Sequence, residues 1–263
     1  MEHKIPLPQK ARAVKKEENR VIFEIDGCYP GYGMTLGNAF RRVLLSSLPG
    51  AAIISVKIKG VSHEFSTIPY VLEDVIHIIL NLKQIRFKVN SPESLPLKIE
   101  LKASGEKEVK AKDIKLSSEI EIINKDAHIA TLTDKKAKLE MEIEIQSGLG
   151  YVPVEQGKKE KLEIGAIAID AIFSPIKKIN YEIENMRVGD RTDFNRLMID
   201  IETDGSVTPE YAFTKAADIL VDHFTPFASE KKIPPADGIL LEGGKESKKK
   251  NKKIKPKAKK GKK

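Results

Sequence analysis

The chain is long enough to fold into one large or two modest domains. It has 263 residues, of which 40% are hydrophobic, so a substantial core can form and a disordered protein is excluded. No stretch approaches the roughly 18 consecutive apolar residues of a membrane-spanning helix. The amino-terminal sequence Met-Glu-His-Lys-Ile-Pro also lacks the apolar segment of a signal peptide. We therefore expect a folded cytoplasmic protein with no membrane segment.

The positive charge of the chain is concentrated at its carboxy-terminal end. Residues 245–263 contain 12 lysines and one glutamate, a net charge of +11. The whole chain carries +8, so +8 minus +11 leaves −3 for the rest of the sequence. We expect residues 228–244 to be a linker and the lysine-rich tail to be disordered, because it cannot bury apolar surface. The tail Lys245–Lys263 either contacts DNA without reading its sequence or is simply solvated.

Alternation of apolar and polar residues predicts a series of one-face-buried antiparallel strands. They cover residues 21–25, 53–59, 97–101, 139–145, 164–170, 179–183 and 196–202. Helical spacing is scarcer and is confined to 35–48, about 69–82 and 208–225. This excess of strands predicts an α+β fold. Residues 103–113 and 124–136 are rich in Lys, Asp and Ser, and we expect them to form exposed loops.

The first predicted helix has two distinct faces. Thr35 is expected to cap it and Pro49-Gly50 to end it, which gives a span of about Leu36 to Leu48. One stripe with the spacing of a buried face consists of Leu36, Ala39, Phe40, Val43 and Leu44. Leu45 lies nearly opposite this stripe, flanked by Asn38, Arg41 and Arg42. A leucine between two arginines on an outer face indicates a second protein surface.

The same region offers a competing interpretation as a nucleotide-binding glycine loop. Gly31-Tyr32-Gly33-Met34-Thr35-Leu36-Gly37 follows a strand and opens a helix, so a small nucleotide-dependent enzyme is the alternative function. The spacing is G-x-G-x-x-x-G, and the next strand carries Lys57 and Lys59 where an acid would bind ribose. We favour a turn with positive φ followed by a close approach of the helix to its neighbour.

Other candidate chemical groups have simpler explanations. His63-Glu64 lacks the spacing of a zinc protease, and Ser46-Ser47 lacks the elbow of a serine hydrolase. Glu73-Asp74 and His77 share one predicted helix face, which we expect to be solvated. Cys28 is the single cysteine, so it forms no internal disulfide and is expected to fill a buried space. We predict no catalytic residue, no metal and no cofactor.

The last predicted helix is apolar over an unusually wide face. Thr208 is expected to cap it, Pro209 to occupy its first position and Glu210 its first turn. Its apolar stripe consists of Phe213, Ala216, Ala217, Leu220 and Phe224, widened by Ala212 and Ile219. Together with the first helix, it can supply two helices per chain to the four-helix core of a symmetric dimer. The alternative is that both helices simply cover their own sheet.

Several motifs resemble one known family. Gly-x-Thr-Leu-Gly-Asn-Ala-x-Arg-Arg-x-Leu-Leu-Ser-Ser-x-Pro-Gly, at residues 33–50, resembles the signature helix of the alpha subunit of bacterial-type RNA polymerase. Further matches follow in order at 61–67, 80–83, 148–153, 170–175 and 191–193. The resemblance covers about residues 15–235. It stops before the small helical domain with which the usual family member contacts promoter DNA, and we expect that domain to be absent here.

The resemblance implies a homodimer that nucleates polymerase assembly by binding the large catalytic subunits, beta and beta-prime. It places the beta contact at Asn38, Arg41, Arg42 and Leu45. Weaker candidates for the beta-prime contact are Lys83, Asp190, Arg191, Thr192 and Asp193. The dimer core is expected to contain Leu36, Phe40, Val43, Leu44, Phe213, Leu220 and Phe224. Plain surface charge is the alternative for each of the charged residues.

The resemblance also implies a discontinuous architecture. A dimerisation domain over 1–49 and 176–234 carries an inserted strand-rich domain over 50–175, and 235–263 forms the linker and tail. The chain is then a scaffold in transcription, a subunit of a nucleotidyltransferase complex in a bacterial cytoplasm or nucleoid, or in an organelle with a bacterial-type polymerase. A free-standing nucleic-acid-binding protein driven by its tail is a third hypothesis, which the −3 balance of the body disfavours.

Overall fold

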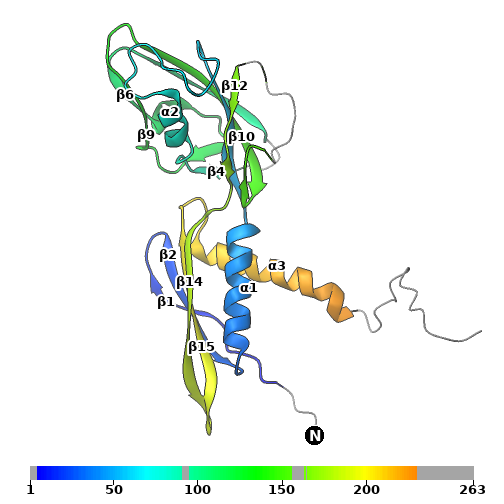
Figure 1. Ribbon diagram of the computed structural model, residues 1–263. Helices are drawn as coiled ribbons and strands as arrows, with labels where there is room; N and C mark the ends of the chain where they lie inside the picture. The colour runs from blue at the N-terminus through cyan, green and yellow to red at the C-terminus, as the bar shows by residue number, and fades with distance from the viewer. Residues whose placement is uncertain (1–4, 91–94, 156–162, 164, 230–263) are drawn as a thin grey trace, which may run out of the picture. The chain divides into compact units, whose positions relative to one another are not determined.

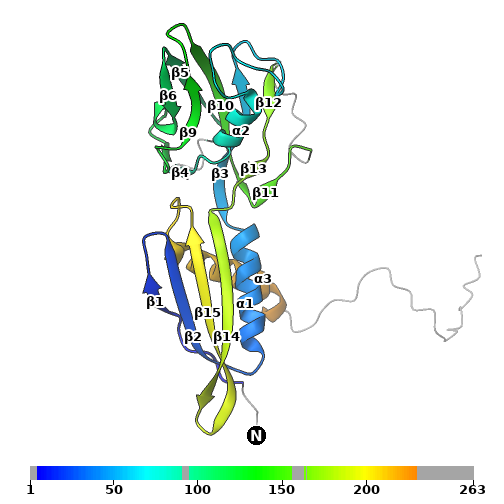
Figure 2. The same cartoon turned by 60° about the vertical axis from the view of Figure 1, so that its left-hand side comes forward.

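The computed structural model describes residues 5–90, 95–155, 163 and 165–229. Its first sheet has four antiparallel strands in the spatial order β1 (Arg12–Lys16), β2 (Arg20–Cys28), β15 (Arg191–Thr203) and β14 (Ile176–Val188). Figure 2 shows these strands side by side, with α1 (Tyr32–Ser46) and α3 (Pro209–Ser229) on one side of the sheet. The first sheet therefore combines strands from both ends of the described chain.

Aromatic stacking joins the first sheet to its two helices. The Phe213 ring of α3 stacks on Phe23 of β2, with ring centroids 4.5 Å apart, and on Phe40 of α1 at 4.8 Å. Ala212 and Ala216 of α3 and Leu44 of α1 are fully buried in the same core. Cys28 is also buried there, and its burial raises the pKa of the thiol. The predicted role of Cys28 as a buried filler is confirmed.

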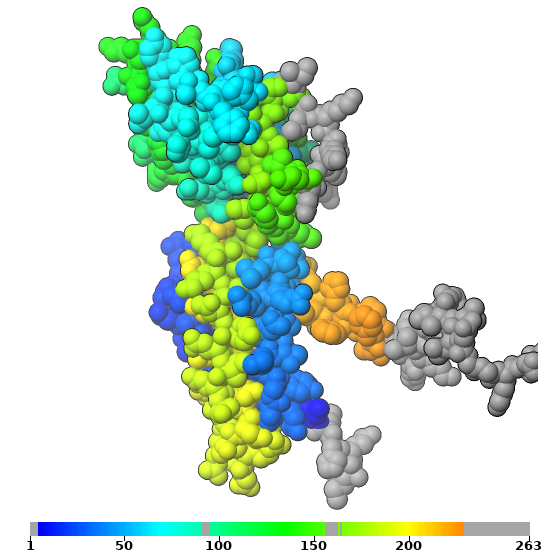
Figure 3. All heavy atoms as spheres, viewed as in Figure 1, coloured from blue at the N-terminus to red at the C-terminus, as the bar shows by residue number. Residues whose placement is uncertain are grey.

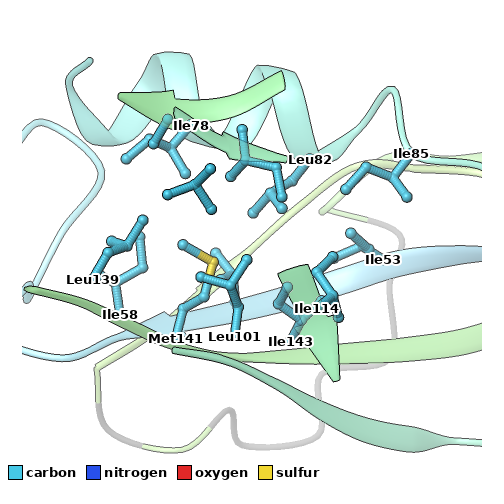
Figure 4. Packing of buried hydrophobic residues seen from close by; sticks show 14 of the residues in the cluster. Ile53, Ile58, Ile78, Leu82, Ile85, Leu101, Ile114, Leu139, Met141 and Ile143 are labelled. Atoms are coloured by element: carbon cyan, nitrogen blue, oxygen red, sulfur yellow. The ribbon is translucent and has the colours of Figure 1, made fainter. Parts of the chain in front are cut away.

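The middle of the chain builds a second sheet with its own core (Figure 1). Its five strands lie in the order β12 (Ala166–Ala168), β3 (Pro49–Ile58), β10 (Lys138–Leu149), β5 (Leu97–Ser104) and β7 (Ile114–Lys115). Helix α2 (Val75–Leu82) covers one face, and Figure 4 shows Ile78 and Leu82 of α2 facing Leu101, Met141 and Ile143 of the sheet. The α+β class is confirmed.

Three short two-stranded sheets complete the middle of the described chain, and the last of them borders a small separate cluster of Ala52, Ala171 and Phe173. They pair β4 (Phe87–Val89) with β8 (Ile120–Ile122), β6 (Lys107–Lys110) with β9 (His128–Leu132), and β11 (Tyr151–Val152) with β13 (Ala171–Ile172); a 3₁₀ turn covers Ala111–Asp113. The prediction of exposed loops over 103–113 and 124–136 is therefore wrong. Val109, Ile129 and Leu132 are fully buried, and these isolated apolar residues are enough to fix each short strand.

The first helix begins earlier than predicted. Gly31 precedes it with a left-handed φ of 86°, and the Gly31 N–H donates to Asn195 Oδ1 at 3.0 Å. Thr35 consequently lies inside the helix and is not its cap. The helix ends at Ser46, and Pro49-Gly50 forms the start of β3. A side chain 164 positions away in the sequence therefore sets the start of α1.

The second helix occupies only the later half of its predicted span. Asp74 caps it, because Asp74 Oδ1 accepts the His77 backbone N–H at 2.8 Å. Glu73 lies outside the helix and accepts hydrogen bonds from the Thr131 N–H at 2.6 Å and the Thr131 hydroxyl at 3.0 Å, and it pairs with His128 Nε2 at 2.8 Å. The prediction of one solvated helix face for Glu73, Asp74 and His77 is wrong, since Glu73 ties the segment before α2 to β9.

The third helix begins as predicted. Thr208 Oγ1 accepts the Tyr211 N–H at 3.3 Å, and Pro209 is the first helical residue. The helix continues to Ser229, so the first two residues of the predicted 228–244 linker are helical. The rest of that linker and the tail 245–263 lie outside the described residues.

Candidate assembly surface

Glycines bring helix α1 unusually close to the first sheet. A Cβ added at Gly37 would lie 2.6 Å from Cδ2 of Tyr181 on β14, and one at Gly33 would lie 3.0 Å from the Asn195 side chain on β15. Both glycines belong to the helix, so the 31–37 segment is no glycine loop, and the nucleotide-binding interpretation loses its structural basis. The favoured interpretation, a positive-φ turn followed by close helix packing, is confirmed at Gly31, Gly33 and Gly37.

We predict that Gly37→Ala destabilises the protein, although alanine favours helix over glycine by up to about 1 kcal/mol. The new methyl group must displace the Tyr181 ring, and overpacking of this kind costs about 1 to 3 kcal/mol. The measurement is urea-induced unfolding. Asn38→Ala, at the next and exposed position, is the matched control and should leave stability unchanged or slightly raised. Stabilisation by Gly37→Ala would show that the close contact is not real.

The opposite face of α1 is uncovered by the described chain. Asn38, Arg41, Arg42 and Leu45 are all exposed, and Figure 3 shows the outer surface of this helix, in blue, open to solvent. Leu45 is 40% exposed. Sequence reasoning missed Met34, which is 63% exposed and lies one turn before Asn38 on the same stripe. Its position four residues before Asn38 places it on the same helix face, and this spacing could have identified it from the sequence.

The two arginines on this face are free to act on a partner. Among the residues that the structure describes, no hydrogen bond or ion pair engages the guanidinium of Arg41 or Arg42. Each guanidinium presents its donors in a planar fork that suits a carboxylate, and Met34 and Leu45 supply apolar area around them. This combination of exposed arginine and apolar side chains is typical of protein interfaces.

The predicted beta-prime residues fall into two separate groups. Lys83 follows α2 and pairs with Asp170, with Nζ and Oδ2 3.1 Å apart. The Val154 N–H and the Lys83 ammonium together hold the pKa of Asp170 below its ordinary value. Residues 190–193 instead lie at the turn between β14 and β15 in the first sheet. The two groups belong to different cores, so they do not form one local site.

Arg191 is engaged within its own chain. Its guanidinium donates to both carboxylate oxygens of Asp193, at 3.0 and 2.6 Å, and lies over the rings of Tyr29 and Phe194. The Arg191 side chain holds the pKa of Asp193 below its ordinary value. Asp190 and Thr192 are exposed at the same turn. Arg191 therefore has a structural role next to the start of α1.

The predicted dimer-core residues differ sharply in their burial. Phe40 and Leu44 are already buried by their own chain, and Leu36, Val43, Phe213 and Leu220 are partly buried against the same core. Phe224 is 65% exposed, and Val221 beside it is exposed as well. The single chain therefore covers Phe40 and Leu44 itself, whereas its described residues leave the later part of α3 uncovered. Exposed apolar residues of this size indicate a surface for another protein.

The described residues contain no cluster of three or more His, Cys, Asp or Glu side chains arranged to hold a metal ion. No helix within the described ranges is both long and apolar enough to cross a membrane.

Comparison with known proteins identifies the family to which the chain belongs. Residues 56–174 match the family model described as RNA polymerase Rpb3/RpoA insert domain. A curated relative from Symbiobacterium thermophilum, named DNA-directed RNA polymerase subunit alpha, is 48% identical over 84% of this chain and 70% of its own length. Relatives with the same name from Salinibacter ruber and Carboxydothermus hydrogenoformans are 45% and 46% identical, over 88% and 87% of this chain and 70% and 72% of theirs.

These matches define a subunit of a multi-subunit RNA polymerase that carries an insert domain. The chain belongs to the family of DNA-directed RNA polymerase alpha subunits. The family resemblance read from the sequence motifs is thereby confirmed.

Proposed function

We propose that this chain is the assembly scaffold of its polymerase: it homodimerises, binds the beta and beta-prime subunits, and contributes no catalytic residue of its own. The observation that carries the proposal is the two-sided character of α1. One side packs on its own sheet through Gly33, Gly37, Phe40 and Leu44, while the other side carries two arginines that pair with none of the described residues and lie among exposed apolar side chains. A helix of a self-sufficient domain has no need of the second surface.

The beta contact of the proposal lies on the outer face of α1. Arg41 and Arg42 are placed to pair with carboxylates of the beta subunit, and Asn38 adds an amide that both donates and accepts. Leu45, together with Met34, is placed to bury apolar area at the same interface. The beta-prime contact is assigned to Lys83 and the turn at 190–193, where Asp190 and Thr192 are exposed. Arg191 supports that turn through Tyr29 and Phe194.

The dimer contact of the proposal uses the later part of α3. We place the dimerisation domain at 1–49 and 176–234 and the inserted domain at 50–175; the family-model match at 56–174 supports these bounds. Residues 235–263 are assigned to the linker and tail. The work of such a scaffold takes place in the cytoplasm or nucleoid.

Reconstitution tests the proposed function directly. Tagged alpha chain is co-expressed with untagged beta and beta-prime from the same organism, and the captured complex is analysed by sedimentation and gel. We expect two alpha chains, one beta and one beta-prime. A parallel titration of the purified chain with nucleotides should show no saturable binding. Capture of neither large subunit, or saturable nucleotide binding, would overturn the proposal.

The proposal assigns the lysine-rich tail a weak and sequence-independent contact with DNA. If about six lysines neutralise phosphates, the logarithm of the affinity should fall with the logarithm of salt concentration with a slope near −5, from about −0.9 per phosphate. Deletion of residues 245–263 should abolish this binding and leave the dimer intact. The measurement is fluorescence anisotropy with labelled duplexes of unrelated sequence. Salt-insensitive or sequence-selective binding would contradict the assignment.

A further inference from the structure

Met34 presents an exposed sulfur on the outer face of α1. It is the third residue of the helix and is 63% exposed. Figure 3 shows the surface of this helix, in blue, open to solvent. Among the residues that the structure describes, no hydrogen bond engages the Met34 sulfur. Small solutes therefore reach its thioether in the single chain.

The other methionines of the described chain are less accessible. Met141 is 4% exposed, inside the core of the second sheet. Met186 is half-buried, and its sulfur accepts the Gly27 N–H at 3.1 Å. Met198 is half-buried on β15. Because oxidation of a thioether follows its exposure, Met34 should react first when the folded chain meets a peroxide.

The single cysteine does not compete for the oxidant. Cys28 is 1% exposed, within the core that the first sheet forms with α1 and α3. Peroxides attack the thiolate form of cysteine, and burial raises the pKa of the Cys28 thiol, so its thiolate is scarce at neutral pH. Met34 is therefore the most reactive sulfur of the described chain.

The neighbours of Met34 decide what its oxidation changes. Asn38, Arg41 and Leu45 follow it at i+4, i+7 and i+11, so these side chains share one stripe of α1. Met34 and Leu45 supply the exposed apolar area of this stripe. A sulfoxide replaces the apolar thioether with a polar, chiral group. A partner that covers Met34 must then bury a polar oxygen, which is unfavourable unless a donor pairs with it.

Oxidation of Met34 leaves the inner side of α1 intact. The helix packs on the first sheet through Phe40 and Leu44, with Gly33 and Gly37 at the closest approach, and Met34 takes no part in this core. The added oxygen lies on the solvent side of the helix. The oxidised chain should therefore keep its fold and differ from the reduced chain in its outer surface alone.

We propose that Met34 is an oxidation site that regulates beta binding: peroxide converts its thioether to the sulfoxide in the free dimer, and the oxidised face no longer docks on beta. This inference rests on the proposed function, because the outer face of α1 is the surface assigned to beta. Beta covers this face once it has docked, so the site responds to oxidant before assembly and is protected after it.

The chemistry is a two-electron oxidation that a reductase reverses. The Met34 sulfur attacks one oxygen of hydrogen peroxide, the O–O bond breaks, an S–O bond forms and water leaves. Sulfur is oxidised and the peroxide is reduced. A thiol-dependent methionine sulfoxide reductase restores the thioether, and two thiols form a disulfide as the oxygen leaves as water.

Peptide mapping tests the site itself. The purified chain is treated with hydrogen peroxide, and the mass of each methionine peptide gives its extent of oxidation. We expect Met34 to react about five times faster, or more, than Met141, Met186 and Met198. In a complex with beta, one Met34 of each dimer should stay reduced, because a single beta covers one of the two α1 helices. Equal rates at the four methionines would overturn the inference.

A matched methionine variant tests the effect on binding. Each tagged chain is oxidised until mapping shows Met34 fully converted, the peroxide is removed, and capture of untreated beta is compared with that of the reduced sample. We expect capture to fall about fivefold or more for the unmodified chain and equally for Met198→Leu. Met34→Leu has no sulfur at this position, so its capture should not change on treatment, whatever its starting level. Repair with reductases for both sulfoxide epimers should restore capture by the unmodified chain.

A partly oxidised sample gives a readout that needs no variant. With beta limiting, the captured dimers should contain less Met34 sulfoxide than the starting sample, whereas the Met186 and Met198 sulfoxides should be equally abundant in both. Circular dichroism and sedimentation of the oxidised chain check that the fold and the dimer persist.

The outcomes separate the inference from the proposed function. If the reduced chain captures no beta, the proposed function fails and the inference fails with it. If the reduced chain captures beta, and the Met34 sulfoxide forms without changing capture or its distribution between captured and starting dimers, the inference fails alone. A loss of capture on treatment that persists in Met34→Leu also overturns it, because another group is then responsible. A loss that requires Met34 and is reversed by the reductases supports the inference.

Discussion

Phe224→Asp is expected to convert the homodimer into a folded monomer. Phe224 is 65% exposed in the single chain, so a charge at this position leaves the fold of one protomer undisturbed. In a dimer it would place an unpaired carboxylate in an apolar interface, at a cost of several kcal/mol. A cost of about 3 kcal/mol raises the dissociation constant about a hundredfold. The measurement is sedimentation velocity over a range of micromolar concentrations, with circular dichroism to show that the fold persists.

The choice of Phe224 follows from how the single chain buries its aromatic residues. Phe40 also belongs to the expected dimer core, but its ring stacks on Phe213 within one protomer, so Phe40→Asp would unfold the chain and report nothing about association. Val14→Asp is a suitable control, because Val14 is an exposed apolar residue on the edge strand β1. A Phe224→Asp protein that remains dimeric at the lowest concentration would remove the later part of α3 from the interface.

Hydrophobic periodicity predicted most of the fold because most of the helices and strands have one buried and one solvent-exposed face. Residues 139–145, where apolar and polar residues alternate, lie at the centre of β10. The helical spacing of Phe40 and Leu44 correctly distinguished the inner face of α1 from its outer face. The paired strands β6 and β9 escaped notice, since each contributes only one to three buried residues among lysines, glutamates and other polar groups. The paired residues of β6 and β9 lie about 20 positions apart in the sequence, so no local pattern predicts that the two strands pair.

The ends of helices were less predictable, because distant side chains fix them. The start of α1 depends on the amide of Asn195, and the segment before α2 is held by Glu73 bonded to Thr131 and His128. Neither contact is visible in a window of sequence. The outward position of Arg41, Arg42 and Leu45 on α1 was predicted correctly, because an outward stripe containing arginine and leucine is a local feature. Met34 was missed only because the helix was expected to begin after it.

Helix α2 also shows how far a local sequence pattern can predict the structure. The sequence Val-Ile-His-Ile-Ile-Leu-Asn-Leu-Lys is apolar on two helix faces, which indicates two neighbours without saying what the second one is. The structure shows that this second face lines an open groove that residues 166–170 of β12 and its continuation also line. An edge strand is recognised by the absence of a neighbour, and this depends on the whole topology of the sheet.

Arg42→Ala and Leu45→Ala are expected to separate beta binding from dimerisation. Both residues are exposed on the outer face of α1, and alanine preserves the helix, so the dimer and its stability should be unaffected. If Arg42 pairs with a buried carboxylate of beta, its truncation should cost about 2 to 5 kcal/mol of binding, or roughly 30-fold or more. Much of that cost comes from the partner charge that is left unpaired.

Leu45→Ala acts on the same contact by a different mechanism. It removes apolar burial worth about 1 to 3 kcal/mol, so its effect should be smaller and less sensitive to salt than that of Arg42→Ala. The measurement is co-purification of beta with each variant at two salt concentrations, with sedimentation of the variant alone. Thr35→Ser is a mild change at an exposed position of α1 that is outside the proposed contact, so it should have little effect, and it tests whether any substitution on this helix disturbs it. Normal beta binding by both alanine variants would show that this face is solvated. Loss of the dimer in either variant would show that beta binding and dimerisation were assigned to the wrong faces of α1.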